Sequence, residues 1–154
     1  MYLILKLVHL IGVVLFLGNI TVGVFWKTFA DRTRDPVVMA ATMDGIIAAD
    51  RIFTIPGVLI LLAGGLGAAL LAGIPILSTG WVLWGLILFT LSGVAFAPLS
   101  RAQREIAAAA HARNMKDYER LSQSWNLWGT IALVLPAAAF AIMILKPVLP
   151  AFHR

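Results

Sequence analysis

Four apolar segments, separated by polar stretches, make up most of this chain of 154 residues. They cover about residues 2–26, 52–72, 81–98 and 127–145. Each is close to or above the ~20 residues that an α-helix needs to cross a ~30 Å hydrocarbon core. Because backbone groups in lipid must bond within their own segment, we expect each segment to be helical. The pattern predicts an all-α, integral membrane four-helix bundle that forms a single domain, 1–154.

The first segment is unusual because it carries two ionisable side chains, Lys6 and His9. At 1.5 Å per residue, His9 lies ~10 Å below the start of the helix. Both side chains fall on one helical face, which we expect to turn toward the bundle interior or a water-filled cavity. In the alternative interpretation, Lys6 reaches the lipid headgroups and His9 makes one hydrogen bond to a neighbouring helix. With no charged leader and no small-residue cleavage site, the segment is expected to be retained.

Small residues recur at four-residue spacing in the second segment, around Gly64, Gly65 and Gly67. Such spacing lets helix backbones approach closely. It predicts a tight helix contact, either within the chain or with another chain. A homo-oligomer or a membrane partner that binds through this face is therefore expected as an alternative.

Two helix starts are predicted in the polar stretches. Asp35 followed by Pro36 suits the N-cap and first position of a helix that continues into the second apolar segment. Asn114, with Asp117 three residues later, suits a second N-cap. His111, just before it, is expected to be a solvated surface histidine.

Three further residues carry predictions about packing. Asn19 is expected to donate an interhelical hydrogen bond. Asn126, between two tryptophans, is expected to be an interfacial cap. Pro136 is expected to kink the fourth segment, which can open room for a neighbour or a ligand.

Composition supports the membrane assignment and excludes several functions. Hydrophobic residues make up 61% of the chain, charged residues only 12%, and the mean hydropathy is +0.95, unlike an ordinary soluble domain. The formal net charge is +5, but the basic residues flank the apolar segments, so no nucleic-acid partner is predicted. With no cysteine, the chain forms no disulfide or thiolate metal site.

The basic residues also predict an orientation. Nine of the twelve lie in the first and third connections, which four spans place on one side. By the positive-inside rule that side is cytoplasmic, and both termini and the 73–80 connection are on the outer side. All carboxylates are expected on the cytoplasmic side, with none inside the spans, which argues against an independent proton-coupled transporter. The nine basic residues are Lys27, Arg32, Arg34, Arg51, Arg101, Arg104, Arg113, Lys116 and Arg120.

The outer end is expected to gather Lys6, His9 and Lys146, with the terminal His153 and Arg154, and no carboxylate. One imidazole and two ammonium groups suit an anionic ligand, or a metal whose charge its own ligand balances. Haem b meets this description, with His9 as the axial metal ligand and Lys6 and Lys146 as partners of the propionates. A bare divalent metal, copper included, finds too few ligands here.

Several strings carry a resemblance to known families. The chain resembles, over nearly its whole length, a bacterial family of small four-helix predicted integral membrane proteins of unknown function. The resemblance is carried by Lys6 to Gly12, Gly80-Trp81 and Lys146-Pro147. More distantly, they are similar to HemJ-type protoporphyrinogen oxidases and CopD-type membrane proteins. The HemJ resemblance implies a haem-binding role for His9 and places the closing Lys-Pro of that family on Lys146-Pro147.

The chain departs from the HemJ pattern at three places. It has Phe25-Trp26-Lys27 instead of Pro-Arg, Gly85 instead of a lysine, and Asn126-Leu127 instead of Asn-Glu. These departures leave His9, Lys6 and Lys146 in place, and the sequence predicts a haem-binding protein of the bacterial inner membrane with a redox role. A non-catalytic membrane subunit or binding module, and a HemJ-like protoporphyrinogen oxidase, remain the alternatives, and whether the protein is an enzyme stays open.

Overall fold

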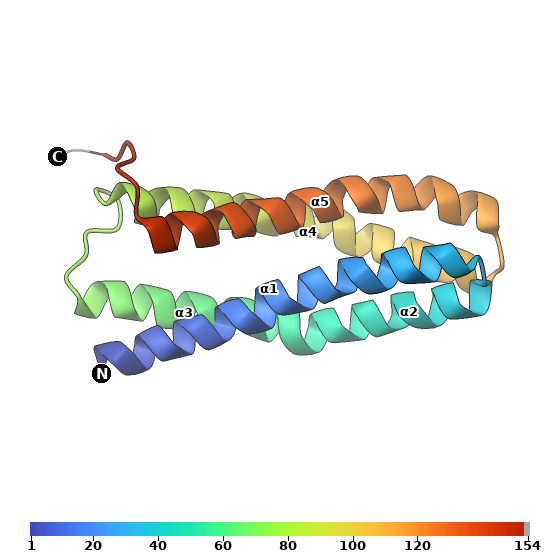
Figure 1. Ribbon diagram of the computed structural model, residues 1–154, viewed down its shortest axis with the longest axis horizontal. Helices are drawn as coiled ribbons and strands as arrows, with labels where there is room; N and C mark the ends of the chain where they lie inside the picture. The colour runs from blue at the N-terminus through green and yellow to red at the C-terminus, as the bar shows by residue number, and fades with distance from the viewer. Residues whose placement is uncertain (153–154) are drawn as a thin grey trace.

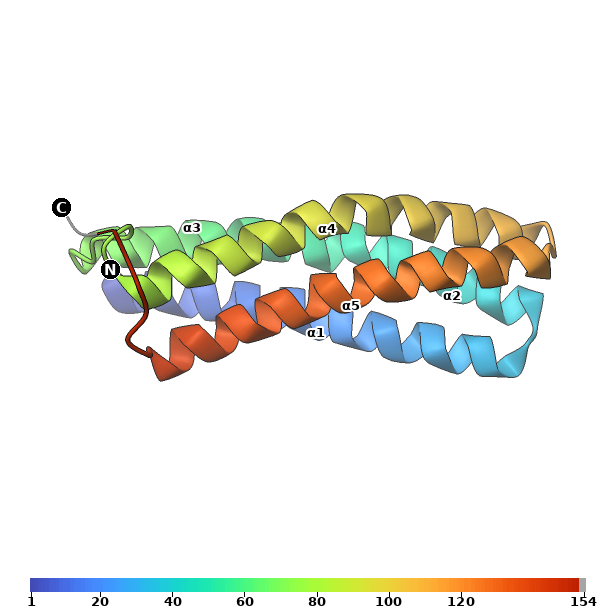
Figure 2. The same cartoon turned by 90° about the horizontal axis from the view of Figure 1, so that it is seen from above.

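The computed structural model describes residues 1–152, and within them every regular element is helical. The expectations for His153 and Arg154 lie outside the described residues. Five long helices and one turn of π-helix form an elongated bundle, with both chain ends at the same end of the molecule in two perpendicular views (Figures 1 and 2). The elements are α1 (Tyr2–Thr33), α2 (Pro36–Ala49), η1 (Asp50–Thr54), α3 (Ile55–Leu71), α4 (Gly80–His111) and α5 (Met115–Leu145).

Helices α2, η1 and α3 run on as one helix, Pro36–Leu71, so the bundle has four long rods. All four rods are long and apolar enough to cross a membrane. This confirms the predicted all-α four-helix architecture. The predicted run of the helix after Pro36 into the second apolar segment is also confirmed.

The rods form two pairs, α1 against α3 and α4 against α5, and α2 packs on α4 to join the pairs at one end. The main hydrophobic core lies toward that end, where alanines and a few large side chains such as Met43 and Ile106 are buried. We call this end of the bundle the charged end, because it holds the α1–α2 and α4–α5 connections, around which most of the basic residues were predicted. The opposite end, with both termini, is the terminal end.

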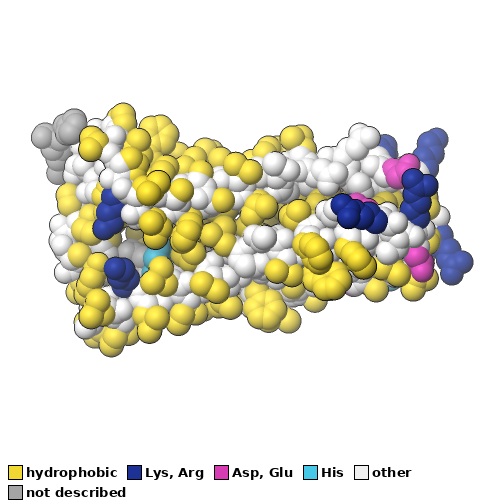
Figure 3. Space-filling model, in the orientation of Figure 1, with side chains coloured by type: hydrophobic (Ala, Val, Ile, Leu, Met, Phe, Trp, Pro, Cys, Tyr) yellow, Lys and Arg dark blue, Asp and Glu magenta, His cyan; other side chains and the backbone are white. Residues whose placement is uncertain are grey.

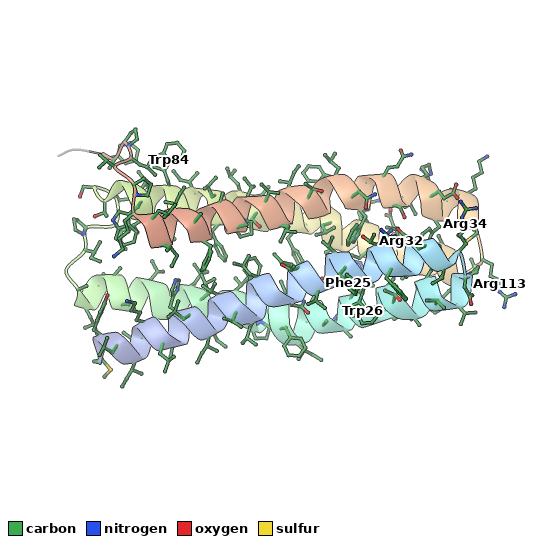
Figure 4. All side chains as sticks on the ribbon, viewed as in Figure 1. Phe25, Trp26, Arg32, Arg34, Trp84 and Arg113 are labelled. Atoms are coloured by element: carbon green, nitrogen blue, oxygen red, sulfur yellow. The ribbon has the colours of Figure 1, made fainter. Side chains whose placement is uncertain are left out.

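Charges and aromatic side chains distinguish the two ends. Arg32, Arg34 and Arg113 lie at the charged end and Trp84 at the terminal end (Figure 4). Phe25 and Trp26 are exposed on α1 and contact each other edge to face. Aromatic side chains near both ends of an apolar rod are typical of the two membrane interfaces.

Large apolar side chains are spread along the whole length of the face shown in Figure 3. Leu3, Leu70 and Val94 are among the many that are more than half exposed. A soluble monomer rarely exposes so much contiguous apolar area. This surface suits contact with lipid chains.

The predicted helix caps are confirmed. The Asp35 carboxylate accepts a hydrogen bond from Val37 N at 2.9 Å, and the Asn114 side chain accepts one from Asp117 N at 3.2 Å. Each satisfies a backbone N–H that the first turn leaves free. The prediction for Asn126 is wrong, because α5 begins eleven residues earlier, at Met115, and Asn126 is an exposed residue inside it.

The π-helical turn η1 follows from Pro56 at the start of α3. Proline lacks an N–H, and its ring clashes with the carbonyl four residues earlier in an α-helix. Widening the turn relieves this clash: Ile55 N bonds to the carbonyl of Asp50, five residues back. Turns of this kind are frequent at functional sites.

Pro136 has a comparable effect inside α5. Its missing N–H leaves the carbonyl of Ala132, four residues earlier, without its helical donor. Ser92 on α4 donates to this carbonyl at 2.8 Å. A side chain of the neighbouring helix therefore replaces the bond that the proline removes, as membrane bundles require.

The small-residue face of α3 packs within the chain. A Cβ at Gly64 would lie 2.5 Å from the backbone N of His9, and one at Gly12 would overlap the backbone of Leu61. The predicted tight helix contact is confirmed, and its partner is α1 of the same chain. The homo-oligomer or membrane partner expected through this face stays a prediction, although α1 already lies against the face.

Candidate functional site

A cavity of about 380 Å³ lies between the two helix pairs at the terminal end. We call it the terminal cavity; its ionisable lining residues include Lys6, His9 and Lys146. Figure 3 shows a histidine in a hollow between two cationic side chains at this end. The structure therefore brings together the three residues that the sequence predicted, from α1 and from the end of α5.

His9 is held in one orientation by α3. Its Nδ1 lies 2.8 Å from the carbonyl oxygen of Leu61. Because a carbonyl can only accept, Nδ1 carries the proton and donates it, which leaves a lone pair on Nε2 in the neutral ring. Nε2 has no hydrogen-bond partner within residues 1–152 and is not among their buried unpaired atoms. This is the arrangement of a metal-binding histidine, whose second nitrogen donates to a backbone carbonyl.

Gly65 makes room for this ring. A Cβ at Gly65 would lie 2.6 Å from His9 Nδ1 and 2.9 Å from its Cε1. Any other residue here would push the imidazole away from Leu61. The small residues of the second segment therefore also position the imidazole, a role that their spacing alone did not reveal.

The C-terminal segment packs against the start of α4, next to the cavity residues Trp81 and Lys146. Lys146 ends α5 in the left-handed conformation, with φ of 46°, and its Nζ lies 5.1 Å from the centre of the Trp81 ring. Trp84 Nε1 donates to the carbonyl of Pro150 at 3.0 Å. A Cβ at Gly80 would overlap the backbone of Leu149, so the Gly80-Trp81 pair lets the segment lie against α4.

Gly85 occupies the lining of the terminal cavity where the HemJ pattern has a lysine. A Cβ at this position would overlap the terminal methyl of Met143. A methionine thus fills the space that a lysine side chain would need. This chain therefore lacks, in the lining of the cavity, one residue of the HemJ pattern.

A second cavity of about 470 Å³ was missed by the sequence reasoning. It lies nearer the charged end, and we call it the Asp50 cavity. Asp50 is only 7% exposed and accepts three hydrogen bonds: from Asn19 Nδ2 at 3.1 Å, Thr54 Oγ1 at 2.7 Å and Gln103 Nε2 at 2.9 Å. The prediction for Asn19 as an interhelical donor is confirmed.

Asp50 was expected beside the end of a span, in a connection, but it is a buried residue of the continuous helix Pro36–Leu71. The adjacent Asp50 and Arg51 resemble a charged boundary, but neighbouring residues on a helix point ~100° apart. Arg51 therefore faces outward, whereas Asp50 faces the bundle. The polar residues Asn19 and Gln103 on other helices were the available signal, since a buried carboxylate needs donors.

Phe16 and Phe89 separate the two cavities. Both residues line both cavities, and their rings meet edge to face with centres 5.5 Å apart. The pair thus bridges α1 and α4 midway along the bundle.

Lys27 also departs from expectation, because it is a buried residue of α1 and not part of a connection. It is 1% exposed and donates to Asp31 at 2.6 Å and Ser122 at 3.0 Å. Tyr118, in the polar first turns of α5, donates to Asp31 at 2.6 Å. Burial and this hydrogen bond raise the pKa of the Tyr118 phenol, which keeps its proton on the oxygen that donates.

His111 lies at the charged end, exposed as predicted, with Nε2 2.8 Å from Asp44 Oδ2. Within residues 1–152 no three His, Cys, Asp or Glu side chains gather into a metal-binding group. The side-chain groups at the terminal cavity that could bind a metal include the His9 imidazole, the Met143 thioether and the Tyr2 hydroxyl.

No match was found among curated proteins or among solved structures. One family model matches residues 3–147, nearly the whole chain, and its description is "Predicted integral membrane protein (DUF2269)". The membrane assignment and the contact with a lipid bilayer agree with this description. The chain belongs to this family of integral membrane proteins, DUF2269.

Proposed function

We propose that the protein binds haem b in the terminal cavity and has a redox role in the membrane. The observation that carries the proposal is the hydrogen bond from His9 Nδ1 to the Leu61 carbonyl. It presents Nε2 as a lone-pair donor beside an apolar cavity. An imidazole held in this way would be able to bind haem iron.

The charges around the cavity support the same ligand. Lys6 and Lys146 flank the imidazole, and no carboxylate lines this cavity within residues 1–152. Two ammonium groups suit the two propionates of haem, since charge-assisted hydrogen bonds are the stronger ones. The volume of about 380 Å³ falls within the range of small-molecule and cofactor sites.

The roles of the chain's own residues follow from these contacts. His9 would hold the iron, Leu61 and Gly65 orient His9, and Lys6 and Lys146 would pair with the propionates. Apolar side chains of all four rods form most of the remaining lining of the cavity. Haem supplies one-electron redox chemistry when it is bound.

Haem titration of the purified protein tests the proposal. We expect wild-type protein expressed with ample haem to show a Soret band with one haem per chain. His9→Ala should abolish this band or shift it strongly, because the axial imidazole is lost. A folded wild-type preparation that stays colourless in the presence of haem would overturn the proposal.

A second variant separates orientation from ligation. Gly65→Ala keeps the imidazole but places a methyl group against His9 Nδ1. We expect it to shift the Soret band and weaken binding while the far-ultraviolet helical signal is unchanged. Gly18→Ala is the matched control, because a Cβ there meets nothing within 4 Å. Identical spectra for Gly65→Ala and wild type would contradict the role assigned to the Leu61 hydrogen bond.

We also propose that the charged end faces the cytoplasm of a bacterium and the terminal end the outer side of its inner membrane. The support is the concentration of arginines at the charged end (Figure 4), as the positive-inside rule requires. Topology reporters fused at Ala110 should report cytoplasm, and reporters after Arg154 the outside. The reverse result at both positions would place the terminal cavity on the cytoplasmic side.

A further inference from the structure

We infer that the Asp50 cavity is a second binding site, which takes a lipophilic molecule carrying an ammonium group. The argument starts from charge. Asp50 lies midway along the Pro36–Leu71 rod and forms no ion pair within residues 1–152. A buried charge is normally paired with an opposite charge.

The three donors around Asp50 are arranged for the ionised carboxylate. Asn19 and Thr54 donate to Oδ1 and Gln103 donates to Oδ2, so both oxygens accept. Neutral donors reduce the cost of burying the negative charge but do not cancel it. Lys27, a buried cation on α1, is already paired with Asp31. A cation from a ligand would complete the site.

The second observation is an unused donor on the same cavity. Trp125 is 5% exposed and lines the Asp50 cavity, and its Nε1 is buried without a hydrogen-bond partner within residues 1–152. A buried tryptophan N–H usually has a partner, and leaving it unpaired costs stability. A ligand oxygen that accepts this hydrogen bond would supply the missing partner. The chemistry therefore calls for an ammonium group and an acceptor oxygen on one molecule.

The remaining lining is apolar and open to the bilayer. Phe16, Phe89 and Phe96 contribute aromatic rings, which attract cations as well as apolar groups. Leu59 and Trp26, which also line the cavity, are 63% and 49% exposed on the outer surface. A ligand that partitions into the membrane thus reaches the cavity from the lipid.

Lidocaine is a suitable probe, because it joins an aromatic ring and an amide carbonyl to an amine that is protonated near neutral pH. Its neutral isostere, with the amine nitrogen replaced by CH, is the matched ligand. Calorimetric titration in a non-ionic detergent should show saturable binding of lidocaine to the wild-type protein. The isostere should bind more weakly than lidocaine by a factor of at least about ten, because it leaves the buried carboxylate without an ion-pair partner.

Asp50→Asn should remove this preference for the charged probe while leaving the weak binding of the isostere unchanged. Trp125→Phe should weaken both ligands, because both carry the carbonyl. Gly93→Leu gives a test that leaves the polar groups intact. Gly93 lines the cavity with open space at its Cβ, so leucine should fill the cavity and block both ligands.

Gly18→Leu is the matched control, since Gly18 also has open space at its Cβ but does not line the cavity. Equal binding of lidocaine and its isostere to wild-type protein would overturn the inference. So would full lidocaine binding in folded Asp50→Asn or Gly93→Leu protein. These results are independent of haem, because the terminal cavity is not touched.

Discussion

The two cavities of this bundle have opposite charge and different construction. The terminal cavity has two lysines and a histidine, and few of its neighbours are fully buried. The Asp50 cavity has one carboxylate held by three donors, and it adjoins the packed core at the charged end. Between them stands the Phe16–Phe89 contact. One small bundle therefore offers an anion-attracting site at one end and a cation-attracting site deeper inside.

The difference shows how each half satisfies its polar groups. At the charged end, Asp50, Lys27 and Asp31 are paired within the chain by side chains from several helices. In the terminal cavity, Nε2 of His9 makes no hydrogen bond within residues 1–152. Buried polar groups are normally paired. An imidazole nitrogen that makes no hydrogen bond can bind a metal, whereas the unpaired Trp125 Nε1 of the Asp50 cavity can only donate a hydrogen bond to a ligand.

The largest expected effect comes from breaking the α1–α3 contact. Gly64→Leu should lower the free energy of unfolding by more than about 3 kcal/mol or prevent folding, since the side chain collides with the backbone of His9. Thermal unfolding in detergent measures it, with Gly18→Leu as the control. A Gly64→Leu protein as stable as wild type would show that α1 and α3 do not pack as described.

Next in size is the buried pair at the charged end. Lys27→Met removes the partner of Asp31 and the donor to Ser122. Because Asp31 is partly exposed, we expect a loss of about 2 kcal/mol, below the range for fully buried pairs. Arg101→Met, which breaks the exposed pair with Glu105, is the control and should leave the melting temperature unchanged. Equal effects of the two variants would remove the distinction between buried and exposed pairs.

A smaller effect is expected where Ser92 supports Pro136. Ser92→Ala should cost about 1 kcal/mol, because it leaves the Ala132 carbonyl unpaired. In a Pro136→Ala background the restored N–H can bond to that carbonyl, so the same substitution should cost much less. A double-mutant cycle measures the difference. Additive costs would mean that the serine does not compensate for the proline.

The smallest effect concerns the lysines of the terminal cavity. Lys146→Ala or Lys6→Ala should weaken haem retention by up to about fivefold, because each is an exposed charge partner. Lys116→Ala, a basic residue at the charged end, is the control. Haem transfer to apomyoglobin gives the rate of loss. A lysine variant that loses haem as completely as His9→Ala would reverse the roles assigned to iron ligand and charge partners.

Much of the fold could be predicted because it rests on local rules. Apolar length predicts the helices, and Asp35 and Asn114 predict two helix starts through their side-chain oxygens. The spacing of Gly64 and Gly65 predicts a close contact, and the residues Lys6, His9 and Lys146 gather because four spans return the chain to one end.

What could not be predicted depends on rotation about helix axes. The direction of Asp50 follows from the π-helical turn before Pro56 and from donors on α1 and α4, which no local pattern encodes. Lys27 is buried because Asp31, Ser122 and Tyr118 come together only when α1 packs on α5. The hydrogen bond of His9 depends on Leu61, 52 residues away.

A crossed binding measurement tests the central claim most directly, because that claim is two separate sites of opposite charge. Haem and lidocaine are each titrated into wild-type, His9→Ala and Asp50→Asn protein under the same conditions. We predict that His9→Ala loses haem and keeps lidocaine, and that Asp50→Asn loses the preference for lidocaine over its neutral isostere and keeps haem. A folded variant that loses both ligands would contradict the claim. So would a His9→Ala protein that still binds haem together with an Asp50→Asn protein that still prefers lidocaine to its isostere.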